Sequence, residues 1–190
     1  MKKENFILHE HFNRALSIEK FDEAKKAYLN SLEINKYAIK DANDIYELID
    51  KIKRTPEKVG PYQNISVFEA LNRIGSDLVL LAGATELFKK TSKIAVDKIE
   101  LKMGNTHGFD FEVSIGEKVI YGEAFNAAES FCKSKMRDAI HKLIDINPDK
   151  NATEAIVFIN EEVKHFIDKY VNKKEKKEKL KIHRIYCGKI

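Results

Sequence analysis

The sequence predicts an α/β protein in which helices flank a mixed sheet, with a helical region at the N-terminus. Residues 1–54 contain no proline or glycine, and their apolar residues recur at intervals of three and four, as on one face of a helix. Beyond residue 92 the apolar pattern changes between a period of two, typical of strands, and a period of three to four. Strands and helices that alternate along a chain favour a layered α/β architecture.

The composition is that of a globular protein, and 190 residues suffice either for one sizeable core or for one core with a small helical appendage. Hydrophobic residues make up 43% of the 190 residues, and charged residues make up 34%. No apolar run approaches the roughly 20 residues of a membrane helix, and the apolar stretch near the N-terminus is too short for a signal peptide. We therefore expect a cytoplasmic location and no membrane partner. Cys132 and Cys187 lack the spacing of a metal or redox pair, which predicts two buried thiols.

A domain boundary is predicted where proline first appears. Pro56 and Pro61 interrupt the helical pattern, because proline disfavours helical backbone in the residue before it. Residues 1–54 would then form the helical N-terminal region, and residues 55–190 the main α/β domain with a basic C-terminal segment.

The main domain is expected to run helix, strand, hairpin, helix, strand, helix, strand. Ser66 followed by Glu69 is a capping-box pattern that starts the first helix, and Gly83 is expected to end or interrupt it. Pro148 closes the second helix. The other segments follow from their periodicity, with strands at 93–103, 154–160 and 182–187, a hairpin at 108–126, and helices beginning near 128 and 161.

The hairpin brings two acids together. Its turn begins at Gly116, because glycine supplies the positive φ that the first central position of a type II′ turn requires. This turn sets Asp110 opposite Glu123, with Cβ atoms roughly 5 Å apart. One face then carries Phe109, Phe111, Val113, Ile115 and Ile120, and the other carries Asp110, Glu112, Ser114, Tyr121 and Glu123.

Three carboxylates on one face, those of Asp110, Glu112 and Glu123, predict a metal site. Carboxylates held this close repel one another and lose hydration unless a cation lies among them. Mg²⁺ suits such a site, because it prefers one or two protein carboxylates together with water and phosphate oxygens. Gly108 and Gly122, each preceding an acid or its strand, indicate close approach of a backbone or a ligand. The alternative is the solvated face of an ordinary antiparallel hairpin.

The order of elements and the spacing of the acids resemble the PD-(D/E)xK nuclease superfamily over about residues 66–160. The pattern of that superfamily is an acid, a gap of about ten to thirty residues, and then an acid, any residue and lysine on the following strand. Asp110 and Glu123 match the two acids, whereas Phe125 stands in place of the lysine. The resemblance implies a restriction-endonuclease-like mixed sheet flanked by helices, phosphodiester hydrolysis, and Mg²⁺ or Mn²⁺ as the cofactor.

The resemblance also implies further catalytic residues. Some members of the superfamily carry the lysine on the next helix, and Lys133 or Lys135 would fill that role here. A helix before the sheet often adds an acid, for which Glu69 is the best candidate and Asp77 the second. A lysine on a helix face is otherwise simply solvated.

The predicted function is that of a Mg²⁺-dependent, restriction-type endonuclease acting on duplex DNA as a homodimer. Asn126 is a candidate phosphate contact, and residues 164–190 carry ten Lys or Arg against three acids. The candidate nucleic-acid contacts in that segment are Lys173, Lys174, Lys176 and Lys177, with a solvated lysine-rich helix as the alternative reading. Residues 1–54 would dimerise or clasp DNA. The competing hypothesis is a catalytically inactive module of the same fold that binds nucleic acid or a protein partner.

Overall fold

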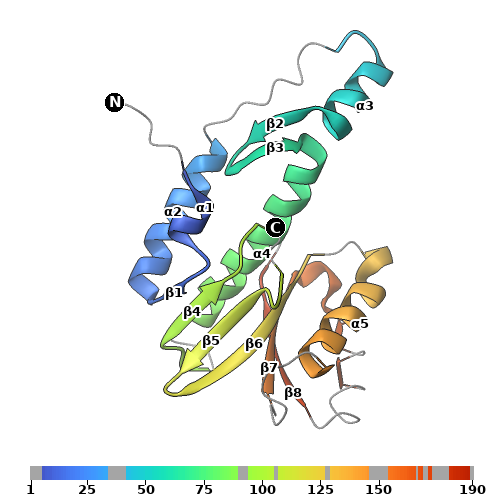
Figure 1. The fold of residues 1–190 in the computed structure, drawn as a ribbon. Coiled ribbons are helices and arrows are strands. Elements are labelled where there is room, and N and C mark those ends of the chain that lie inside the picture. Colours follow the sequence, from blue (N-terminus) through green and yellow to red (C-terminus); the bar gives the residue numbers. More distant parts are fainter. Residues whose placement is uncertain are drawn as a thin grey trace.

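The structure, a computed structural model, describes residues 6–33, 42–89, 94–104, 107–126, 129–145, 154–165, 167–168, 171–172 and 180–188. Helices flank a six-stranded mixed sheet, and a separate two-stranded hairpin precedes the longest helix (Figure 1). The helices are α1 (Leu8–His11), α2 (Ile18–Glu33), α3 (Ile45–Arg54), α4 (Val67–Leu87), α5 (Glu129–Asp145) and the 3₁₀ turn η2 (Glu161–Val163). The strands are β1 (Ala15–Leu16), β2 (Pro56–Val59), β3 (Tyr62–Ser66), β4 (Lys98–Leu101), β5 (Phe111–Ile115), β6 (Lys118–Phe125), β7 (Glu154–Ile159) and β8 (Lys181–Tyr186).

The sheet has the strand order β1-β4-β5-β6-β7-β8. Neighbours from β1 to β6 are antiparallel, whereas β6, β7 and β8 run parallel to one another. A parallel pair needs a crossover connection, and α5 lies within the crossover between β6 and β7. The predicted mixed sheet flanked by helices is therefore confirmed.

Each face of the sheet has its own apolar cluster. The helix α4 covers one face, and α5 covers the other, as Figure 1 shows. The strand β7 supplies both clusters, because Ile156 and Phe158 point toward α4 while Val157 and Ile159 point toward α5. This confirms the expectation that 154–160 forms a strand buried on both faces. Cys132 and Cys187 are both buried thiols, also as predicted.

The helix α4 starts as predicted but continues past its predicted end. The Ser66 side chain accepts a hydrogen bond from the backbone N–H of Glu69, which caps the helix. Gly83 lies within the helix and does not end it. A glycine is required at this position because the ring of Phe158 occupies the space that a side chain would need. A Cβ on Gly83 would lie 2.2 Å from Cγ of Phe158. That ring stacks on Phe111 of the hairpin, with centroids 3.9 Å apart.

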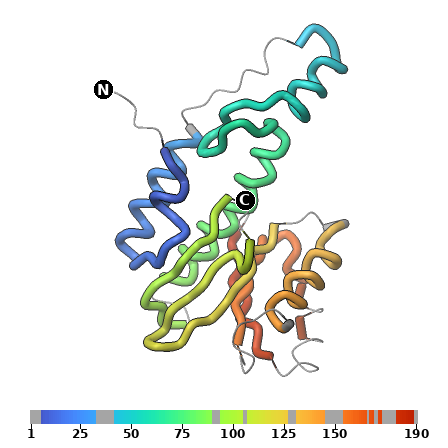
Figure 2. The backbone as a smooth tube through the Cα atoms, viewed as in Figure 1, coloured from blue at the N-terminus to red at the C-terminus, as the bar shows by residue number. Residues whose placement is uncertain are grey.

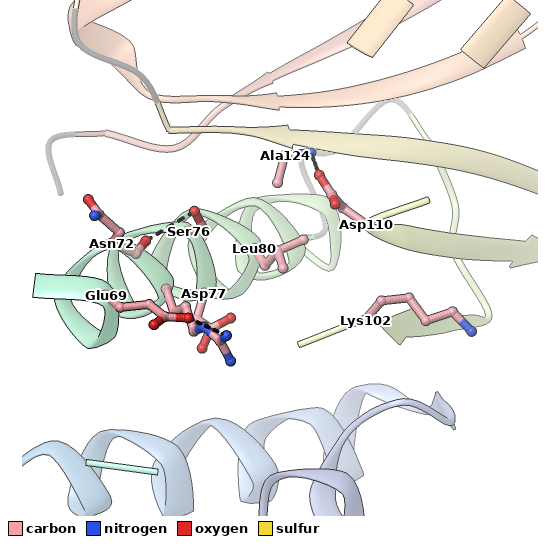
Figure 3. A pocket seen from close by; sticks show the side chains of 9 residues that line it. Glu69, Asn72, Ser76, Asp77, Leu80, Lys102, Asp110 and Ala124 are labelled. Atoms are coloured by element: carbon pink, nitrogen blue, oxygen red, sulfur yellow. Dashed lines mark hydrogen bonds and ion pairs between the residues drawn. The ribbon is translucent and has the colours of Figure 1, made fainter. Parts of the chain in front are cut away.

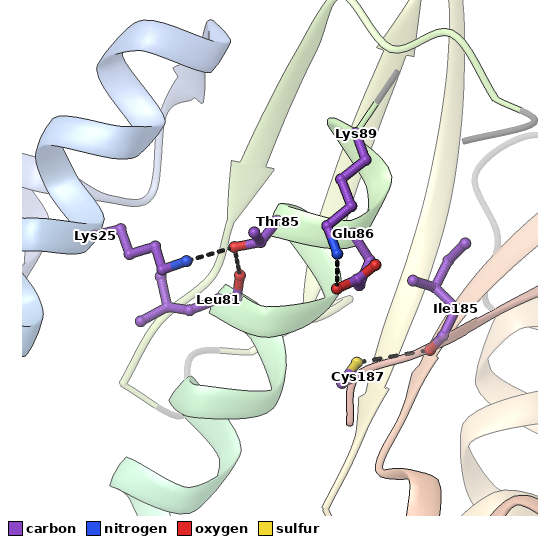
Figure 4. A network of polar contacts seen from close by, with 7 residues as sticks. All are labelled: Lys25, Leu81, Thr85, Glu86, Lys89, Ile185 and Cys187. Carbon is purple, nitrogen blue, oxygen red and sulfur yellow. Dashed lines mark hydrogen bonds and ion pairs between the residues drawn. The ribbon is translucent and has the colours of Figure 1, made fainter. Parts of the chain in front are cut away.

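The N-terminal region contributes to the main core. It contains a short strand that the periodicity did not predict, β1, which pairs with β4 at the edge of the sheet. Four of its aromatic or aliphatic side chains, Phe12, Leu16, Phe21 and Tyr28, are buried in the cluster that lies between α4 and the sheet. Lys25 of α2 also donates a 2.8 Å hydrogen bond to the Thr85 hydroxyl of α4 (Figure 4). The predicted role of residues 1–54 in dimerisation or DNA clasping stays a prediction.

The predicted boundary at Pro56 and Pro61 coincides with the hairpin β2–β3. Together with α3, this hairpin lies beside the N-terminal half of α4, at the end of the molecule far from β8 (Figures 1 and 2). In the described part of the chain, no helix combines the length and the apolar content that a membrane span requires.

Candidate active site

The hairpin has the predicted register. Strands β5 and β6 pair with Ile115 opposite Lys118, and Gly116 has a φ of +58°. The ladder ends at the pair of Phe111 and Gly122, and the backbone N–H of Asp110 donates to the Gly122 carbonyl at 3.1 Å. Asp110 therefore reaches the position next to Glu123, one step beyond the regular ladder.

Glu123 is a buried carboxylate paired with a lysine from α5. The residue is 6% exposed, and its Oε1 lies 2.7 Å from Nζ of Lys142. Burial, together with the negative charge of Asp110, raises the pKa of Glu123 to about 7, although Lys142 acts in the opposite direction. Lys142 therefore offsets only part of the cost of holding this charge inside the protein.

Asp110 is a part-buried acid that lies beside Glu123. Its Oδ2 accepts a 2.8 Å hydrogen bond from the backbone N–H of Ala124. Burial raises the pKa of Asp110 above its ordinary value, whereas the Ala124 N–H and the charges of Lys142 and Lys135 lower it. Because both carboxylates ionise less readily than in water, a cation that neutralises the pair would remove an existing energetic cost.

A cavity of about 250 Å³ adjoins Asp110. Figure 3 shows its lining, in which α4 contributes one wall and the end of the hairpin another. The lining residues are Glu69, Asn72, Arg73, Ser76, Asp77, Leu80, Lys102, Asp110 and Ala124. Arg73 pairs with Glu69 at 2.5 Å, but its buried Nε has no hydrogen-bond partner among the described residues. The cavity therefore has both acidic and basic side chains in its lining, with Asp110 at its hairpin wall.

The two acids predicted on α4 have different surroundings. Glu69 lines the cavity together with Asp110, so the structure brings these two predicted residues to one place. Asp77 is 2% exposed and accepts hydrogen bonds from the hydroxyls of Tyr28 and Tyr62. These bonds tie the N-terminal region and β3 to α4, which is a structural role.

The lysine that contacts Glu123 is Lys142, and the sequence interpretation missed it. Lys133 is exposed on α5 and makes no hydrogen bond or ion pair within the described residues. Lys135 is also exposed, but its ammonium donates to the Asn126 carbonyl at 3.4 Å and its charge reaches Asp110. A signal was available: Lys135 and Lys142 are seven residues apart, which is close to two helical turns, so they share a face that Lys133 does not.

Glu112, which was predicted as a third metal ligand, has its own set of neighbours. It stands opposite Glu100 of β4, and Lys102 pairs with both of these carboxylates, at 3.6 Å from Glu112. Figure 3 shows the ammonium of Lys102 turned away from the side chains of α4. No group of three or more Asp, Glu, His or Cys residues within the described chain is arranged to hold a metal. Asp110 and Glu123 therefore lie together, whereas Glu112 lies beside Lys102, and its role as a metal ligand stays a prediction.

Two phenylalanines and a glycine near the acids have explanations that involve no ligand. Phe109 was predicted beside Phe111, but it packs on the α5 side against Tyr121, because the chain bends at residues 107–110 and ends the alternation. Phe125 is 2% exposed beneath α5, on the same side as Glu123. A Cβ on Gly122 would lie 2.1 Å from Cζ of Phe111, so the close approach predicted there is that of an aromatic ring.

The predicted nucleic-acid contacts fall into two groups. Asn126 lies at the end of β6, and its amide packs against Gly75 of α4. Lys173, Lys174, Lys176 and Lys177 lie outside the described residues. Comparison of the chain with models of protein families, with curated proteins and with solved structures gives no significant match.

Proposed function

We propose that this protein is a Mg²⁺- or Mn²⁺-dependent nuclease that hydrolyses phosphodiester bonds, with duplex DNA as its substrate. The observation that carries the proposal is the pair of adjacent carboxylates, of which Asp110 is part-buried and Glu123 is buried, with Lys142 2.7 Å from Glu123. The order α4, β4, β5, β6, α5 and β7 supports it, because this is the order on which the resemblance to the PD-(D/E)xK superfamily rests. The finer restriction-endonuclease-like assignment of the fold belongs to the same proposal.

The two acids fit a hard divalent cation. Mg²⁺ takes one or two protein carboxylates and fills its other positions with water and substrate oxygens, so a third protein acid is not required. A bound ion of this kind acts as a Lewis acid toward phosphoryl oxygens and water. The raised pKa values of both acids are consistent with a site whose charge is incompletely balanced by the protein itself.

The lysines of α5 would serve the reaction through their charge. In phosphodiester hydrolysis, water attacks phosphorus while the bond to the leaving oxygen breaks, and negative charge increases on the phosphoryl oxygens. Lys142 holds the Glu123 carboxylate in place, and Lys135 presents an exposed ammonium near Asp110. Positive charge placed beforehand at such a site stabilises the transition state. The cavity beside Asp110 would receive the substrate strand.

A second candidate function is supported by Phe125. The resemblance expects a lysine at this position, but the described structure has a buried aromatic ring there. A protein that had lost catalysis while keeping the fold would bind nucleic acid or a protein partner without cutting. This inactive module is the alternative that the experiment must distinguish.

The experiment is a cleavage assay with purified protein and plasmid, linear duplex, single-stranded DNA and RNA, in Mg²⁺, Mn²⁺ or EDTA. We expect metal-dependent cleavage of duplex DNA, and a loss of about two to four powers of ten in rate for Asp110→Asn and Glu123→Gln. Glu112→Gln is the matched control, because this acid lies on the same hairpin but pairs with Lys102.

Three outcomes are decisive. Cleavage by Asp110→Asn or Glu123→Gln at the wild-type rate would show that the proposed site is wrong. An equal loss of activity in Glu112→Gln would show that the effect is not specific to Asp110 and Glu123. Wild-type protein that binds DNA but cuts no substrate with either metal would establish the inactive module.

A further inference from the structure

The helix α3 has an apolar stripe that the described chain leaves largely uncovered. None of its ten residues is buried. Ile45, Tyr46 and Ile49 are 59%, 82% and 44% exposed, although an amphipathic helix of a globular protein normally packs its apolar stripe against a core. This helix also lies beside β3 and the start of α4, at the end of the molecule far from β8 (Figures 1 and 2).

The neighbouring start of α4 extends the apolar surface. Phe68 and Leu71 are 52% and 53% exposed, and the ammonium of Lys53 from α3 lies 5.8 Å from the Phe68 ring centroid. Half of the large hydrophobic side chains that are exposed in the described chain therefore lie within residues 45–71. Exposed apolar residues scattered singly are ordinary, whereas a concentration of them marks an interaction site. We call Ile45, Tyr46, Ile49, Phe68 and Leu71 the α3 surface.

The charges along α3 are divided between its two halves. Reading from its N-cap, the acids are Asp44, Glu47 and Asp50, and the bases that follow are Lys51, Lys53 and Arg54. Within one copy, Glu47 pairs with Lys51 at 2.8 Å and Asp50 pairs with Arg54 at 2.7 Å, and surface pairs of this kind are weak enough to exchange for partners in a second copy. Two copies of this segment placed antiparallel would set the acidic half of each against the basic half of the other. A parallel arrangement would instead oppose like charges, which is unfavourable.

We propose that the α3 surface binds a second copy of this chain, with the two α3 helices antiparallel across a twofold axis. A twofold interface uses the same patch on both partners, so the patch must be self-complementary, and a segment with three acids followed by three bases meets this condition. The apolar residues supply the buried area, and the charges fix the direction.

Other occupants fit this surface less well. The phosphates of a nucleic acid would attract the Lys and Arg side chains in the last turn of α3. The same phosphates would be repelled by Glu47 and Asp50, which precede those basic residues on the helix. An anionic membrane surface would be repelled in the same way. The self-association does not depend on the proposed nuclease activity, so each can fail without the other.

The first experiment measures the mass of the full chain by sedimentation equilibrium between about 1 and 100 µM. We expect a reversible dimer, and we expect Ile49→Glu to raise its dissociation constant at least about tenfold, because a charge would be placed in the apolar contact. Phe131→Glu is the matched control, because Phe131 is a 65% exposed apolar residue on α5, outside the α3 surface. Circular dichroism checks that both variants fold, which the exposure of the two positions favours.

The second experiment tests the direction of pairing. One variant carries Lys51→Glu, Lys53→Glu and Arg54→Glu, and the other carries Glu47→Lys and Asp50→Lys. Each should be monomeric alone, because its α3 has a single sign of charge, and an equimolar mixture should form a mixed dimer.

Several results would overturn the proposal. A wild-type chain that is monomeric at 100 µM would refute it, and so would a dimer that Ile49→Glu leaves intact. Two charge variants that fail to pair when mixed would refute the antiparallel arrangement. Assembly that requires added DNA would assign the surface to nucleic acid instead.

Discussion

Asp77 makes the stability of the protein depend on pH in a direction opposite to that of most carboxylates. Asp77 belongs to α4, and its side chain is buried. The carboxylate accepts hydrogen bonds from the Tyr28 hydroxyl at 2.7 Å, from the Tyr62 hydroxyl, and from the Gly104 N–H at 3.4 Å. Burial raises the pKa of Asp77 to about 6, and these hydrogen bonds and the charge of Arg73 only partly oppose it. The folded state therefore binds the Asp77 proton more tightly than the unfolded state does.

The magnitude follows from the difference between the two pKa values. An increase from 3.8 to about 6 corresponds to about 3 kcal/mol, at about 1.4 kcal/mol per pKa unit. Because the folded pKa is the higher one, the full stability is present below about pH 4 and is lost as the pH rises through 6. About half of the loss, roughly 1.4 kcal/mol, falls between pH 5 and pH 8.

The test compares wild type with Asp77→Asn by urea denaturation at pH 5 and pH 8, followed by circular dichroism. The amide does not titrate, so the free energy of unfolding of the variant minus that of wild type should increase by about 1.4 kcal/mol between the two pH values. Taking this difference removes the constant cost of replacing an oxygen by an NH₂ group. Asp138→Asn, at a site on α5 with 69% side-chain exposure, is the control and should show no such change. Equal pH dependence in wild type and Asp77→Asn would refute the reasoning.

Two further predictions concern α5 and α4. In a single-turnover assay, Lys142→Ala should lower the cleavage rate by about two to four powers of ten, and Lys135→Ala should lower it less. The exposed Lys133→Ala should match wild type. Equal activity of all three variants would exclude an α5 lysine from the reaction. Gly83→Ala should lower the free energy of unfolding by about 2 to 3 kcal/mol, because its methyl group would meet the stacked Phe158 ring, as urea denaturation can measure. Gly75→Ala should stay within about 1 kcal/mol of wild type, because its methyl group meets only the movable end of the Asn126 amide; similar losses for both glycines would contradict this explanation.

The hairpin and β7 were predictable because local rules determine them. A two-residue turn with glycine at its first central position leaves one register, and that register fixes which residues of β5 and β6 face each other. Six apolar-rich residues of β7 between polar flanks require burial on both faces. In both cases the period and the turn chemistry agree with the final packing.

Other features depend on contacts between distant segments, which periodicity does not contain. The strand β1 has two residues, too few for any period, and it exists because Ala15 and Leu16 reach the free edge of β4. Phe109 leaves the face predicted for it because the regular strand begins only at Phe111. Gly83 looked like a helix end, but it is a site of close packing, since the sequence alone does not show that Phe158 lies against it.

In the acidic site, too, contacts within the hairpin were predictable from the sequence, whereas the contact with another element was not. Asp110 and Glu123 come together through the hairpin, so counting residues was enough to place them. The partner of Glu123 comes from another element, and its identity depends on how α5 is rotated about its axis. That rotation is set by Cys132, Met136 and Ile140, which are buried against the sheet. With α5 held in this orientation, the Lys142 ammonium reaches Glu123, whereas Lys133 is exposed to solvent. The sequence therefore specifies that a helical lysine is available, and the packing of α5 selects which one reaches the acid.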